Sequence, residues 1–172
     1  AFLGGEEDHW ENRLRLAGAR ETLEAEGAGL PPRWIFHAGN WETTSAYSWG
    51  ERIARECDGL TALICANDRM AQGAIMGIRR AGLRVPEDIS VTGFDNFAFR
   101  NNFDPEFSDP PLTTLDYPGY EIGYRSVERL LAADIANSPG GITIPPALIL
   151  RRSTVPLAEG ATVGPANDYV CL

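Results

Sequence analysis

The sequence predicts an α/β fold in which a parallel sheet is flanked by helices. Short apolar runs alternate along the chain with segments of helical period, which is the βαβ rhythm of parallel sheets. The 172 residues, 44% apolar and 23% charged, suffice to bury a core, so a disordered chain is a poor interpretation. The longest apolar stretches, such as residues 60–66, are far shorter than the ~20 residues that a transmembrane helix needs.

The first part of the chain contains uninterrupted strand–helix units. Asp8 is a candidate N-cap of the first helix, and Gly27 is a candidate stop. The turn before the fourth strand contains Pro86, which suits a turn start. Strands are expected at residues 1–4, 33–38, 60–66 and 89–94, and helices at about 10–26, 43–57 and 67–82, the last with Met70, Ala74, Ile75 and Ile78 on one side.

The pattern changes after Asp95. Residues 97–111 are aromatic and rich in Asn, Asp and Pro without a helical period, which is typical of a functional loop or a crossover. A strand at 112–115, a helix at about 119–137 and a last strand at 147–151 follow, and residues 158–172 resemble a loose extension. The helix pairs Glu121 with Arg125 opposite an apolar stripe of Val127, Leu130, Leu131 and Ile135.

Charge and cysteine usage restrict the partners. A net charge of -9 argues against a broad phosphate-binding surface on this chain itself. Cys57, Cys65 and Cys171 are an odd, widely spaced set, which suits buried thiols in a reducing compartment better than a disulfide framework or a metal knuckle.

Polar residues gather where the predicted strands end. In an open α/β sheet the ligand crevice lies outside the carboxyl ends of the strands. Two glycines, amides, carboxylates and an indole would therefore share one rim, which favours a small polyhydroxylated or heterocyclic ligand. The strand ends are Gly4-Gly5, Gly39-Asn40-Trp41, Asn67-Asp68 and Asp95-Asn96.

Each of these residues also has a purely structural interpretation. Asn67 and Asp68 could cap the following helix, and Trp41 could be a core or hinge aromatic. Asp95 could form an Asx-turn, and Arg15 could be a solvated or ion-paired side chain of the first helix.

Covalent and metal chemistry have weak signals. His9 and His37 lack a metal-binding spacing, and the cysteines form no CxxC pair. The glycine pair at 4–5 is neither a dinucleotide fingerprint nor a Walker loop, and there is no GxSxG elbow. We therefore expect no catalysis, no metal and no cofactor.

Several segments resemble, in order and spacing, the effector-binding core of the lactose/galactose repressor (LacI/GalR) family of bacterial transcription regulators. The similarity covers residues 1–156 and leaves the tail uncovered. Its main carriers are residues 63–74 (LICANDRMAQGA), 81–96 (AGLRVPEDISVTGFDN) and 110–114 (PPLTT), supported by residues 13–18, 39–41 and 151–154.

The resemblance implies a two-lobed clamp of the periplasmic-binding-protein type that closes on a small effector, a sugar or a nucleobase. By position, Arg15 and Asp95 match the charged pair that holds the effector, Asn67 an amide contact and Trp41 the stacking aromatic. It further implies a cytoplasmic homodimer that reaches operator DNA through a headpiece outside this sequence, with no membrane partner. A periplasmic or transporter-linked sugar-binding protein is the alternative.

The resemblance also implies a division of the chain into segments of two lobes. Residues 1–108 would form the carboxyl-terminal lobe, 109–146 a crossover segment belonging to the amino-terminal lobe, 147–156 a return strand and 157–172 a loose tail. The sequence departs from the family pattern at two positions. Tyr117 stands where the family usually has glutamine, and Gly119 where some members place an aromatic contact. The identity of the effector is therefore left open. The apolar stripe of the helix at 119–137 would need a partner.

Overall fold

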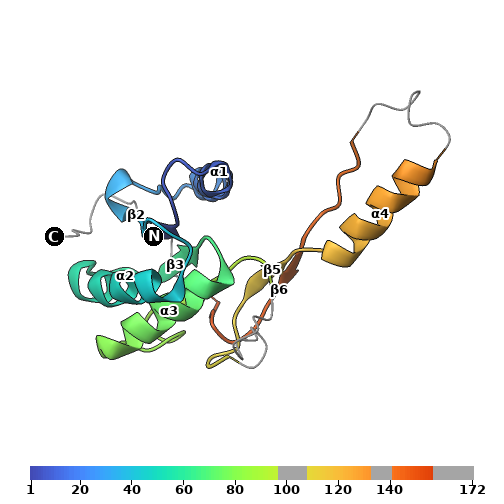
Figure 1. Cartoon of the computed structure of the whole chain (residues 1–172). Coiled ribbons are helices and arrows are strands. Elements are labelled where there is room, and N and C mark those ends of the chain that lie inside the picture. The colour runs from blue at the N-terminus through green and yellow to red at the C-terminus, as the bar shows by residue number, and fades with distance from the viewer. Residues whose placement is uncertain (97–107, 133–140, 157–172) are drawn as a thin grey trace.

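The computed structural model describes residues 1–96, 108–132 and 141–156, which form a body and a projecting arm (Figure 1). The body contains a parallel sheet with α1, α2 and α3, and the arm consists of β5, β6 and α4. The elements are β1 (Phe2–Gly4), α1 (Trp10–Ala25), a 3-10 turn (Pro32–Trp34), β2 (Ile35–His37), α2 (Thr43–Glu56), β3 (Ala62–Cys65), α3 (Asp68–Arg80), β4 (Ser90–Thr92), β5 (Thr114–Asp116), α4 (Gly119–Leu131) and β6 (Ala147–Ile149).

The sheet of the body is parallel in the order β2-β1-β3-β4. Phe2 of β1 pairs with Ile35 of β2 on one side and Ile64 of β3 on the other. Helix α1 covers one face, while α2 and α3 lie together on the other (Figure 1). The strand order reverses between β1 and β3, so the crevice expected at a topological switch point lies at their carboxyl ends.

Helices α2 and α3 approach so closely that glycine is required at their contact. A side-chain carbon on Gly73 would strike the Thr43 carbonyl, and one on Gly77 would strike the Tyr47 carbonyl. Helix α3 also carries the four predicted core residues Met70, Ala74, Ile75 and Ile78, all buried. The predicted apolar face of this helix is therefore confirmed.

Some predicted boundaries shift. Asp8 does not cap α1: the N-cap is His9, which makes no side-chain cap bond. The second strand begins at Ile35 because the Pro31-Pro32 pair leads into a 3-10 turn. Strand β5 begins at Thr114, because Leu112 is buried in the core and Thr113 donates its N–H to the Ser153 hydroxyl. Gly27 does end α1, at a φ of 74°.

The cysteine prediction holds for one residue and fails for another. Cys65 is a buried free thiol, and burial raises its pKa. Cys57, which follows α2, is disulfide-bonded, and its partner lies outside the described residues. Spacing along the chain could not reveal which cysteines come together in space.

The arm is held to the body by buried polar contacts at its base. Strands β5 and β6 pair antiparallel, with Thr114 opposite Ile149. The Thr114 hydroxyl donates to the buried Asp68 carboxylate at the start of α3, at 2.5 Å. The arm therefore begins next to the carboxyl end of the body sheet.

Helix α4 exposes its apolar stripe. Leu130 and Leu131 are 72% and 81% exposed, and Val127 is also exposed, whereas Ile135 lies outside the described residues. The opposite side carries Arg125, which bonds both Glu121 and Glu128. Within the described ranges, each helix is too short or too polar to cross a bilayer.

Candidate functional site

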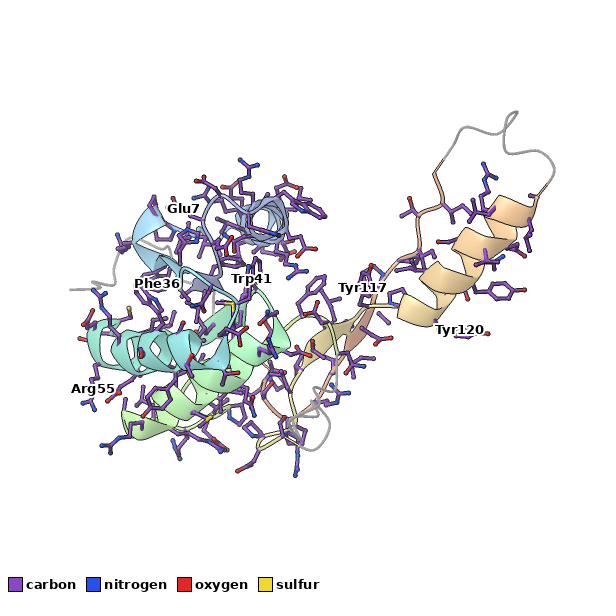
Figure 2. The ribbon with its side chains drawn as sticks, viewed as in Figure 1. Glu7, Phe36, Trp41, Arg55, Tyr117 and Tyr120 are labelled. Atoms are coloured by element: carbon purple, nitrogen blue, oxygen red, sulfur yellow. The ribbon has the colours of Figure 1, made fainter. Side chains whose placement is uncertain are left out.

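All four residues expected to bind a ligand line one cavity at the carboxyl ends of the body strands. The cavity has a volume of about 410 Å³, within the range of small-molecule sites. Arg15, Trp41, Asn67 and Asp95 share its wall with His9, Glu11 and Tyr117. In Figure 2, Trp41 lies at the strand ends of the body and Tyr117 at the base of the arm. The residues expected at the strand ends, together with Arg15 of the first helix, therefore lie around one concavity.

Arg15 reaches this cavity from the second turn of α1 and is held on one side. Its Nη1 donates to the carbonyl of Ala66, at the end of β3, over 2.6 Å. Its guanidinium carbon lies 4.0 Å from the centroid of the Phe94 ring, within the range of a cation–π contact. The other terminal nitrogen, Nη2, lies 3.5 Å from Glu11 and 3.8 Å from Asp95, beyond hydrogen-bond length. A donor is thus fixed in place between two carboxylates.

Asp95 follows β4 in an unusual backbone conformation. Its φ is 107°, a value that strains a residue with a side chain by about 1–3 kcal/mol and that clusters at ligand sites. Its N–H donates to the Leu115 carbonyl at 3.0 Å, and its own carbonyl accepts from Tyr117, so β5 fixes this backbone. Burial raises the pKa of the carboxyl, Arg15 opposes that rise and Glu11 adds to it.

Asn67 has the capping role that its position suggested. Its Oδ1 accepts from the N–H of Met70 at 2.8 Å, at the start of α3. The amide nitrogen takes no part in this cap, and the residue still lines the cavity. Capping and ligand contact are therefore compatible, because they use different atoms of one amide.

Trp41 closes the apolar side of the cavity. Its indole lies against Gly5, where a side-chain carbon would come within 2.6 Å of the ring. The His9 ring meets the indole edge-on, with centroids 5.1 Å apart at 75°. The glycine after β1 is thus required for the indole to lie flat over the strand end.

This arrangement can bind and orient a small polar molecule. A planar cation, two carboxylates and an amide supply donors and acceptors, while an indole and a phenol ring supply apolar faces. Within residues 1–96, 108–132 and 141–156, His, Cys, Asp and Glu form no group that could hold a metal ion.

Three contributors to the site, Glu11, His9 and Phe94, were not expected from the sequence. Glu11 precedes Arg15 by four residues on a helix, so the sequence spacing could have predicted that the two side chains lie close together. No such spacing indicates His9 and Phe94, because their roles depend on the packing of Trp41 and Arg15. Tyr117 lines the cavity from the position where the resemblance had noted a departure.

Comparison with protein families gives a match over nearly the whole described chain. The profile of the periplasmic binding protein-like domain matches residues 1–154. The chain belongs to this family. Within it, the chain is homologous to the effector-binding core of LacI/GalR regulators, as the resemblance predicted.

Curated relatives are repressors. The HTH-type transcriptional repressor PurR of Aliivibrio salmonicida is 39% identical over 127 residues, which cover 74% of this chain and 36% of that protein. The PurR repressor of Escherichia fergusonii is 35% identical over 157 residues, 90% of this chain and 42% of that protein. The chain therefore spans less than half the length of these relatives.

Solved structures confirm the fold. The Lac repressor dimer bound to operator and the anti-inducer ONPF superposes with a TM-score of 0.76 at 33% identity, covering 91% of this chain and 52% of that one. The transcriptional repressor ascG of Escherichia coli gives 0.75 at 30% identity, covering 89% and 54%. The predicted α/β lobe with a parallel sheet is thus confirmed, and it matches about half of each of these repressor chains.

Proposed function

We propose that this chain is the effector-sensing part of a cytoplasmic transcription regulator. In this role a small molecule binds at the cavity of Arg15, Trp41, Asn67 and Asp95 and changes the operator affinity of the whole protein. The observation that carries the proposal is the convergence of these four side chains on one 410 Å³ cavity at the carboxyl ends of the strands. Membership of the periplasmic binding protein-like family and the similarity to PurR repressors add support.

The chemistry of the cavity favours a sugar or a nucleobase-like effector. The Asp95 carboxylate would accept hydrogen bonds from hydroxyl or N–H groups of the ligand, and the Nη2 of Arg15 would donate to an oxygen or ring nitrogen. The Trp41 indole would cover an apolar sugar face or a heterocycle. Tyr117 replaces the usual glutamine of the family, so its phenol would adjust selectivity on the side of the arm.

In this proposal residues 1–108 and 147–156 belong to one lobe, and residues 109–146 cross to a second lobe. The division into two lobes is supported by the arm, which leaves the body at Thr114 and exposes the apolar stripe of α4. Burial of that stripe in the second lobe would close the cavity from the other side, and DNA contact would come from a separate headpiece.

Homodimerisation belongs to the same proposal. The support is general: regulators of this kind read paired half-sites on DNA with two copies. Light scattering of the full-length protein at working concentration is expected to give a dimer. A stable monomer under the same conditions would contradict this part.

The testing experiment is a thermal-shift screen of the full-length protein with sugars, polyols and nucleobases. A ligand that binds the folded state raises the melting temperature by an amount that grows with the logarithm of its concentration over Kd. We expect one class to do so, and the upstream gene sequence to encode a helix-turn-helix. A signal peptide there would instead favour the transporter-linked sugar-binding alternative.

A further inference from the structure

Three chain segments meet where the arm leaves the body. The end of β4 and the residues after it run parallel to β5 and the residue before it, with bridges between Thr92 and Thr113 and between Asp95 and Asp116. Strand β6 pairs with the other edge of β5 and continues to Arg151. The junction is therefore a small sheet in which β5 is central.

One amide spans this junction. The Asn96 Nδ2 donates to the Asp116 carboxylate at 2.9 Å, and the Asn96 Oδ1 accepts from the Nη2 of Arg151, also at 2.9 Å. Both ends of the Asn96 amide are thus used, one towards β5 and one towards the segment after β6.

Arg151 makes two further hydrogen bonds to the residues that precede β5. Its Nη1 donates to the Leu112 carbonyl at 2.8 Å, just before β5. Its backbone N–H donates to the hydroxyl of Thr113 at 3.0 Å. A guanidinium can serve two acceptors at once in a fixed fork, which an ammonium group cannot reproduce.

This cluster adjoins the strained residue of the cavity. Asn96 directly follows Asp95 and is also left-handed, with φ of 49°, a conformation that asparagine tolerates better than most residues. Asp95 has φ of 107° and needs its surroundings to maintain it. Its backbone bonds to Leu115 and Tyr117 lie on either side of Asp116.

We propose that Asn96, Asp116 and Arg151 form a latch that holds Asp95 in the conformation that points its carboxylate into the cavity. The three are positioning residues, because they act through Asp95 and do not line the cavity themselves. The importance of Asp95 as an effector contact rests on the proposed function, whereas its conformation can be measured without an effector.

The test uses native-state amide hydrogen exchange, followed by NMR, on the full chain. Asn96→Asp keeps the acceptor for Arg151 but places a carboxylate against Asp116. We expect exchange of the Asp95 and Tyr117 amides to accelerate about tenfold, since each bond lost weakens local protection. The Ala66 amide, which donates to the Leu3 carbonyl inside the body sheet, should keep its rate.

The swapped pair Asn96→Asp with Asp116→Asn provides the rescue. It restores a donor facing an acceptor with the direction reversed and with unchanged net charge, so the Asp95 and Tyr117 rates should return towards those of the parent. If each substitution only damaged the local structure, the two effects on the exchange rate would add, and the double variant would exchange faster than either single variant.

Arg151→Lys provides an independent variant, with Arg152→Lys as its matched control. Arg152 is the next residue, is exposed and is outside the latch. We expect Arg151→Lys to accelerate the Asp95 amide and Arg152→Lys to leave it unchanged. Unchanged Asp95 exchange in both Asn96→Asp and Arg151→Lys would overturn the proposal, as would failure of the swapped pair to rescue. No result of this experiment depends on whether an effector is found.

Discussion

The Arg15 guanidinium and the Asp95 carboxylate lie next to each other in the wall of the candidate cavity, where Nη2 and Oδ1 are 3.8 Å apart, an ion pair too long for a direct hydrogen bond. Both side chains are partly exposed, at 18% and 32%. Opposite charges held this close without a bond between them can each engage a ligand atom. The arrangement therefore gives orientation as well as attraction to a molecule in the cavity that contacts both groups.

Arg15→Ala is expected to weaken effector binding by about 2 kcal/mol, roughly 30-fold in Kd, the usual cost of losing hydrogen bonds to a charged group. The measurement is calorimetric titration of the full-length protein with the ligand found by thermal shift. Arg13→Ala is the matched control, because Arg13 lies on the same helix, is exposed and does not line the cavity. Equal weakening by both changes would count against a specific role for Arg15.

Effector affinity is expected to fall in acid. Burial raises the pKa of Asp95 above its ordinary value of 3.8, so the carboxylate becomes protonated at a higher pH than an exposed one. Binding that needs an ionised acceptor is then full at neutral pH and is lost as pH falls through the raised pKa. The contribution of Asp95 to the free energy of unfolding should change in the opposite direction and rise as pH falls, because a carboxyl group with a raised pKa favours the folded state at lower pH.

The same titration in the Asp95→Asn protein is the control for this pH dependence. This variant should bind more weakly at neutral pH, and its residual affinity should lack the acid-dependent loss. An identical pH profile in the two proteins would assign the titration to another group.

Gly5→Ala is expected to displace the Trp41 indole, because the added carbon would lie within 2.6 Å of the ring. Tryptophan fluorescence should change, and effector affinity should fall. Gly18→Ala on α1 is the matched control, since a side chain there meets open space. That control should stabilise the protein by up to about 1 kcal/mol. Binding unaffected by Gly5→Ala would contradict the stacking role of Trp41.

Asn67 allows capping to be separated from ligand contact. Asn67→Ala should lower the free energy of unfolding by about 1 kcal/mol through loss of the cap to Met70. Asn67→Ser retains a capping oxygen but removes the amide nitrogen, so stability should largely persist while affinity drops. Denaturant unfolding and calorimetry measure the two effects. If the serine variant binds like the parent, Asn67 is a cap alone.

Much of the body could be predicted because its signals are local. The apolar period of α3 named its buried residues correctly. The rule for strand ends indicated Trp41, Asn67 and Asp95, the family resemblance added Arg15, and all four line one cavity. Residues separated widely in the chain meet there because parallel strands end at the same edge.

The missed features depend on tertiary contacts. Nothing near Asn96 in sequence shows that its amide joins Asp116 to Arg151. The positive φ of Asp95 depends on bonds to β5, and the spacing of the cysteines does not show that Cys57 is disulfide-bonded. Such contacts form only after the segments have crossed, so periodicity and spacing do not encode them.

The most direct test of the account is the operator affinity of the full-length protein, measured with and without the ligand that most raises its melting temperature. The ligand is predicted to shift operator affinity in the parent and to leave it nearly unchanged in Arg15→Ala at the same ligand concentration. An equal shift in both proteins would show that the effector acts elsewhere and would contradict the assignment of this cavity.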